Sequence, residues 1–162
     1  MRWFIFFFTL MLVSNLEVAE VRDLYRKAVE SEAEATALYA MLQDVNENDD
    51  KVLVGYKGAL TAITAKYEKE VKTKKERFKT GVSLIEFAVS QEPENVELRF
   101  IRLSIQQNSP KFLKYKKNIS EDKALIFDNL KSLENTKLKA HIEDYILYSK
   151  NFSEQEKNVI SQ

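Results

Sequence analysis

The sequence reads VLVGYKGALTAITAKY between residues 52 and 67, and this stretch decides the fold. Its apolar side chains return at intervals of three, four and seven residues, which places them on one face of an α-helix. They are Val52, Tyr56, Ala59, Leu60, Ile63 and Tyr67. A half-buried strand would instead alternate apolar and polar residues. The stretch therefore predicts an amphipathic helix with one buried face.

The same periodicity extends outward on both sides of this helix. Upstream, Ser31 and Glu34 match a capping box, which predicts a break between two helices; one kinked helix is the alternative. Downstream, a helix that carries Phe78 and Val89 on its apolar face ends near Pro93. Further helix starts are predicted at Asn95, Ser120, Thr136 and Ser153.

The composition agrees with a helical protein. No segment shows the alternation of a half-buried strand, and the chain has only 3 Gly and 2 Pro. Helices tolerate few of either residue, whereas β-proteins use both in turns. Amphipathic helices joined by short polar connectors bury their apolar faces by pairing. The sequence therefore predicts an all-α fold, an irregular antiparallel stack of helical hairpins.

The first residues have the composition of an export signal. Arg2 precedes an apolar run from Trp3 to Val13, and a basic start with a short apolar core is typical of a secretory signal peptide. A membrane span needs about 20 apolar residues, and this run is well short of that. We predict a signal peptide at 1–19, with cleavage after Ser14 or an uncleaved, loosely anchored chain as alternatives.

Removal of this leader leaves residues 20–162, which we expect to form a single all-α domain with no transmembrane helix. A chain of that size buries roughly 70% of its unfolded surface, enough for a core without cross-links. There is no Cys, which excludes disulfides and the acylated Cys of a lipoprotein anchor. We expect an exported protein of the periplasm or cell envelope.

One part of the chain follows a family pattern. The residues Phe78, Gly81, Ile85, Ala88 and Pro93, in the spacing Phe-x2-Gly-x3-Ile-x2-Ala-x4-Pro, resemble the second helix of a tetratricopeptide repeat. That family places small residues where its two helices touch. The resemblance therefore implies close helix contacts at Gly81 and Ala88.

The resemblance covers about residues 51–105, one degenerate unit and half of a second. Gly58 resembles the small residue of the first helix, but it lies farther from Gly81 than in the family, so we expect an extended hairpin loop at roughly 66–76. The family generally supplies peptide-binding or assembly scaffolds, and the resemblance implies such a role. In organisation the chain also looks like short exported helical proteins of Bacteroidota-type bacteria.

Two stretches concentrate positive charge. Residues 66–79 hold seven Lys and Arg residues with Glu between them, which suits either an anionic membrane surface or, as we expect, a solvated face with helical ion pairs. Residues 111–117 mix lysines with Phe112 and Tyr115, a combination that could bind single-stranded nucleic acid. An exported protein rarely meets that ligand, so we expect no nucleic-acid partner and predict that both rings fasten this connector to the core.

Residues 44–50 match only part of a calcium-binding loop. Asp44, Asn46 and Asn48 stand at the first three ligand positions of an EF-hand, but Asp49 replaces the required Gly and Gly55 replaces the bidentate Glu. We expect a solvated loop whose Asp49 or Asp50 caps the next helix. The single histidine, His141, has no predicted partner and is expected to pack partly buried. No catalytic, metal or cofactor site is expected.

These observations favour an interaction module over an enzyme. The 25 basic and 25 acidic residues cancel, so no overall field attracts nucleic acid or membranes. We expect a protein or peptide partner in a groove between hairpins, with candidate residues Tyr56, Ile63, Arg99 and Arg102. Two alternatives remain: an enzyme whose site forms only in three dimensions, and a membrane-surface protein that uses residues 66–79.

Overall fold

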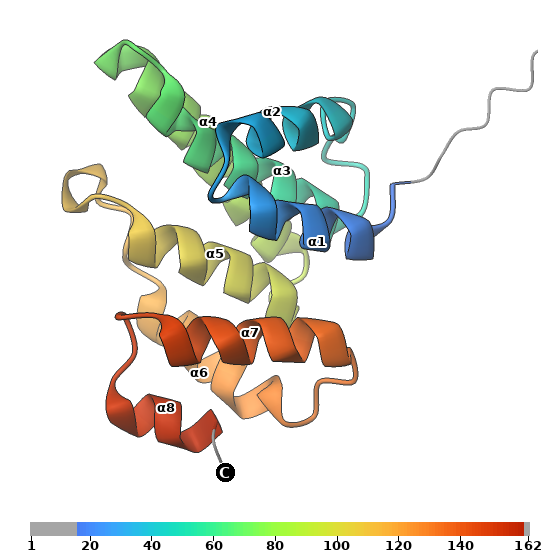
Figure 1. Cartoon of the computed structure of the whole chain (residues 1–162), viewed down its shortest axis with the longest axis vertical. Coiled ribbons are helices and arrows are strands. Elements are labelled where there is room, and N and C mark those ends of the chain that lie inside the picture. The colour runs from blue at the N-terminus through green and yellow to red at the C-terminus, as the bar shows by residue number, and fades with distance from the viewer. Residues whose placement is uncertain (1–15, 161–162) are drawn as a thin grey trace, which may run out of the picture.

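The computed structural model describes residues 16–160, so most of the predicted leader, including Ser14, lies outside the described residues. The described residues form eight α-helices, two 3₁₀ turns and no strand, which confirms the predicted all-α class (Figure 1). The helices are α1 (Val18–Ala28), α2 (Glu32–Met41), α3 (Lys51–Thr64), α4 (Val71–Gln91), α5 (Val96–Asn108), α6 (Ile119–Leu130), α7 (Thr136–Tyr148) and α8 (Glu154–Ile160). The 3₁₀ turns are η1 (Ala65–Tyr67) and η2 (Lys111–Leu113).

Side-chain caps begin several helices where the sequence predicts them. The Ser31 hydroxyl accepts the Glu34 N–H at 3.4 Å, so α1 and α2 are two helices with a break between them. Asn95 accepts two backbone N–H groups at the start of α5. Ser153 and Glu156 bond reciprocally before α8, as a capping box requires. These short-range contacts set the helix boundaries.

The predicted cap of α6 at Ser120 is two residues too late. The helix begins at Ile119 with Asn118 as its N-cap residue. The Asp122 N–H already bonds to the Asn118 carbonyl at 2.9 Å, which places Ser120 inside the first turn. Glu121 and Asp122 remain in that turn, where negative charge is favourable.

Consecutive helices pair as hairpins: α1 with α2, α3 with α4, α5 with α6, and α7 with α8. The third and fourth helices pack at glycines. A Cβ on Gly58 would lie 2.7 Å from the Gly81 carbonyl oxygen, and a Cβ on Gly55 would contact the Ala88 side chain at 4.0 Å. Positions advance along α3 as they recede along α4, so the two helices are antiparallel. The predicted contacts of Gly81 and Ala88 are therefore present.

The predicted loop at roughly 66–76 is mostly helix. After η1 the chain needs only three residues before α4 begins at Val71, and α4 then runs for 21 residues. Lys, Glu and Arg are good helix formers, so the extra residues lengthen α4 rather than its connector. Among residues 16–160 no helix, α4 included, is apolar enough over its length to cross a bilayer.

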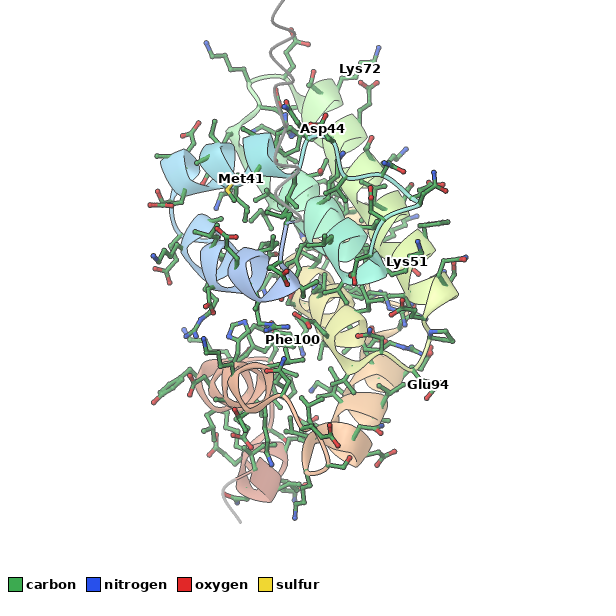
Figure 2. The ribbon with its side chains drawn as sticks, turned by 90° about the vertical axis from the view of Figure 1, so that its right-hand side faces the viewer. Met41, Asp44, Lys51, Lys72, Glu94 and Phe100 are labelled. Atoms are coloured by element: carbon green, nitrogen blue, oxygen red, sulfur yellow. The ribbon has the colours of Figure 1, made fainter. Side chains whose placement is uncertain are left out.

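Two hydrophobic cores share α5. Leu98, Ile101 and Ile105 join the first core with α1 to α4, whereas Phe100 and Leu103 join the second with α6, α7 and α8. In Figure 1 α5 lies between these two groups of helices, and in Figure 2 Phe100 lies at the level where they meet. Because α5 is covered on both sides, most of its polar residues are buried as well: Glu97, Arg99, Arg102, Gln106 and Gln107.

Candidate partner-binding groove

A groove opens beside the N-terminal half of α4. It has a volume of about 610 Å³ and lies between that half-helix, the end of α3 with η1, and the segment from the end of α5 through η2. Its apolar lining includes Val29, Ile63, Val71, Phe78, Ile105 and Phe112. This volume and this apolar lining are typical of a ligand-binding site.

Two large apolar side chains stand on the rim of the groove. Val71, the first residue of α4, is 67% exposed, and Phe112 in η2 is 68% exposed. Exposed Phe and Val next to a concave apolar surface mark a site of interaction, because their transfer from water is favourable. The prediction for residues 111–117 is half wrong: Tyr115 is buried against Phe78, but Phe112 faces solvent.

A second, more polar hollow of about 480 Å³ continues the groove along α4 towards Ser83. The two hollows share Lys75, Phe78, Phe112 and Leu113, so they form one surface. We call the first hollow the apolar part of the groove and the second its basic part. An occupant of both would contact apolar side chains and ammonium groups in each part, with the larger apolar lining in the first.

Lysines surround both parts. They are Lys66, Lys74, Lys75, Lys79 and Lys114, and no described residue of the lining is an aspartate or glutamate. The segments 66–79 and 111–117, which lie far apart in the sequence, therefore place their charges around one surface. In Figure 2 Lys72 lies in the first turn of α4 and Glu94 lies just beyond its last turn, and the groove lies towards the Lys72 end.

The lysines near the groove differ in their partners. Lys66 donates to the Val29 carbonyl at 3.2 Å and lies over the Tyr67 ring. Within residues 16–160, no ion pair joins Lys74, Lys75 or Lys79 to a carboxylate. Like charges held close together create a positive local potential although the chain as a whole is neutral.

Lys114 has an unusual backbone conformation. Its φ of 54° and ψ of 31° place it in the left-handed region, and it alone among the described non-glycine residues has a positive φ. It ends η2, where its N–H bonds to the Lys111 carbonyl at 3.1 Å. A residue with a Cβ pays about 1–2 kcal/mol for this conformation, which glycine avoids. The position nevertheless carries a lysine at the edge of the basic part.

Tyr56, one of the four predicted groove residues, is in the core. Its hydroxyl donates to Glu97 Oε1 at 2.7 Å, and Arg22 forms two further hydrogen bonds of 2.7 Å with the same carboxylate. Burial is the main cause that raises the pKa of Tyr56, and the neighbouring charge of Glu97 is the second. The phenol therefore stays protonated as a donor. This network joins α1, α3 and α5.

Arg99 and Arg102 are also buried, and they hold α5 to α6. Arg102 forms hydrogen bonds of 2.9 and 2.6 Å with the two oxygens of Asp122, and Arg99 donates to the same carboxylate at 2.9 Å. Burial alone would lower the pKa of Arg102, but the hydrogen bonds and charge of Asp122 raise it. Asp122 is fully buried, and Arg99 and Arg102 each pair with a second carboxylate, Glu121 and Glu86 respectively.

The predicted groove of four residues is therefore corrected. Only Ile63 lines the groove. Tyr56 bonds to Glu97 on α5, and Arg99 and Arg102 bond to Asp122 on α6, because all three lie on covered faces of α3 and α5. Sequence reasoning missed Phe112, Val71 and the lysines as members of one site. The available signal was the presence of two basic stretches that both contain aromatic residues.

The other motifs have structural roles. Asp50 caps α3 by accepting the N–H groups of Val52 and Leu53, and the loop before it bonds internally. No group of three or more metal-binding side chains occurs in the described part of the chain. His141 packs edge-on against Phe100 with ring centroids 5.2 Å apart, as its predicted packing role requires.

The fold and the groove define a class of structure: an all-α hairpin stack with an open apolar groove whose rim is basic. Comparison with known proteins gives no match to a family model, a curated protein or a solved structure. The tetratricopeptide resemblance therefore stays a prediction.

Proposed function

We propose that this protein is an exported interaction module of the periplasm or cell envelope, and that it binds a segment of a partner protein in the groove between α4 and η2. The observation that carries the proposal is the apolar concavity of about 610 Å³ with Val71 and Phe112 exposed on its rim. Covering these side chains removes apolar surface from water, which drives association.

The chemistry of the lining supports binding rather than catalysis. Acid–base catalysis by carboxylates needs two such groups within reach of a substrate in one pocket. The described lining residues are mostly apolar groups and lysines, with a few hydroxyl and amide groups and no carboxylate. The buried carboxylates of Glu97 and Asp122 are held by arginines between helices. The tetratricopeptide resemblance, which implies a peptide-binding scaffold, points in the same direction.

The proposal is tested by comparing two exposed aromatic positions. Phe112→Ser removes a rim residue of the groove, and Tyr148→Ser removes an 85% exposed ring on α7 that is not part of the groove lining. Each tagged protein is used to capture partners from fractionated native cells, and the captured protein is then purified and titrated directly. We expect binding to be lost in Phe112→Ser and kept in Tyr148→Ser. Equal binding to both variants would reject the groove as the docking site.

A second function is favoured by one observation, the convergence of both basic stretches near exposed Val71 and Phe112. Lysines flanking apolar side chains bind anionic membrane surfaces, with about 1 kcal/mol contributed by each cation near the surface. Sedimentation with vesicles of phosphatidylglycerol and phosphatidylcholine tests this function. Binding that requires the anionic lipid and Phe112 would support it, and unbound protein at low salt would reject it.

A further inference from the structure

We infer that the groove takes an amphipathic helix whose flanks are acidic; this inference rests on the proposed docking function and adds the chemistry of the partner. The occupant's apolar face would cover Ile63, Phe78 and Phe112 in the apolar part of the groove. Its carboxylates would lie against Lys75, Lys79 and Lys114 in the basic part.

A helix fits the groove better than an extended strand. The described part of the chain has no sheet, so no strand edge offers backbone hydrogen bonds to an extended segment. A helix satisfies its own backbone and needs only side-chain contacts. The lining runs along α4 from Val71 to Ser83, which corresponds to roughly 18 Å at the helical rise. A partner helix of about 12 residues spans this length.

Charge complementarity requires acidic flanks. The lining brings five lysines together without a described aspartate or glutamate, so a basic segment would be repelled and an acidic one attracted. Lys74, Lys75 and Lys79 form no ion pair within the described residues, so a partner's carboxylates do not have to displace an existing bond. Desolvation next to apolar side chains strengthens such contacts.

Two other occupants fit the observations less well. In a two-fold contact between copies of this chain the same lysines would face one another, which is unfavourable. A bilayer is broad and nearly flat, so it would reach Val71 and Phe112 on the rim but leave lining residues such as Ile63 and Phe78 uncovered. A helix can place one apolar face into such a concavity while its other faces stay in solvent.

The inference is tested with displayed peptides. The protein is expressed with its own leader, purified from the compartment where it accumulates, and panned against random peptides of about 16 residues. We expect the enriched peptides to carry apolar residues at helical spacing together with Asp and Glu. A synthetic copy should become helical on binding and bind less tightly as salt rises.

Matched variants locate the binding. The double variant Lys75→Glu with Lys79→Glu should lower the affinity for the synthetic peptide by about tenfold or more. The single variant Phe112→Ser should lower it by a similar factor. The control, Lys131→Glu with Lys150→Glu, reverses two exposed lysines outside the groove lining and should change affinity by less than about twofold. Thermal unfolding of each variant establishes that it is folded.

The possible outcomes distinguish a failure of the acidic-helix inference from a failure of the proposed docking function. Enriched peptides that are neutral or basic, yet lost with Phe112→Ser, would overturn the acidic partner and leave docking in place. Absence of any peptide that depends on Phe112 would overturn both. Anionic vesicles that bind through Phe112 while no peptide does would assign the surface to a membrane and overturn the inference.

Discussion

Gly58 and Gly81 bring the backbones of α3 and α4 into contact. A Cβ on Gly58 would lie 2.7 Å from the Gly81 carbonyl oxygen and 2.9 Å from the backbone nitrogen of Ile85. The atoms in the way belong to the backbone, so no side-chain rotation can make room. This approach holds α4 in the position from which its N-terminal half forms one wall of the groove.

Replacement of Gly58 by alanine should therefore destabilise the protein. Alanine favours a helix by up to about 1 kcal/mol, but overpacking against backbone costs about 1–3 kcal/mol and dominates here. Gly55→Ala is the matched control, because its one close contact, at 2.6 Å, would be with the end of the Leu98 side chain, and no backbone atom stands in the way. Urea unfolding should show a clearly larger loss for Gly58→Ala; equal losses would contradict the assigned contact.

Substitution of either member of the buried Arg22–Glu97 ion pair alone should destabilise the protein. Glu97→Gln leaves the Arg22 cation, whose side chain is only 6% exposed, without its charged partner. We expect a loss of about 3 kcal/mol in the free energy of unfolding. The control is Glu94→Gln, an exposed carboxylate nearby in the chain, with a change within about 0.5 kcal/mol.

A double-mutant cycle tests the same pair independently. Arg22→Met combined with Glu97→Gln removes both charges, so the combined loss should be smaller than the sum of the two single losses. Additive losses would show that the two side chains do not interact energetically.

His141 should make stability fall in mild acid. Burial is the main cause that lowers the pKa of His141 below its ordinary value of 6.5, and the nearby positive charge of Arg26 is the second. The negative charge of Asp144 opposes this shift. Below pH 6.5 the unfolded state therefore binds the proton more readily than the folded state. The stability that neutral His141 contributes is present above pH 6.5 and is lost as the pH falls through the lower, folded-state pKa.

The measurement is the free energy of unfolding between pH 7.5 and about 5 for the native protein and for His141→Gln. The chain has one histidine, so the difference between the two curves in this range reports that ring. The native protein should lose stability relative to the variant as the pH falls. Parallel curves would show that the ring protonates as easily in the folded protein as in the unfolded chain.

Lys114→Gly should raise stability by about 0.5–1 kcal/mol. Glycine accepts a φ of 54° without the steric cost of a Cβ, which outweighs its greater freedom in the unfolded chain. Thermal unfolding checks the effect, and Lys117→Gly is the control because Lys117 has no positive φ. The same variant should weaken binding of an acidic peptide, since it removes a charge from the groove. A stability loss equal to that of Lys117→Gly would argue against the left-handed conformation.

The sequence by itself determined the helical class and most helix boundaries. The period of apolar residues and the caps at Ser31, Asn95 and Ser153 act within one or two turns, so a reader of the chain can locate them. The close contact at Gly81 was implied by the tetratricopeptide resemblance. The start of α6 was misplaced because Asn118 and Ser120 are both acceptable cap residues, and only the backbone bond to Asp122 distinguishes them.

Only the tertiary structure decided which faces remained open. A groove could use the polar or aromatic side chains of Tyr56, Arg99 and Arg102. However, α5 lies between two cores, and both of its arginines form buried ion pairs with Asp122. Phe112 and Lys75 meet around one concavity although they belong to separate stretches of the chain. The periodicity of a helix shows that a face is buried, whereas its partner depends on how distant helices pack.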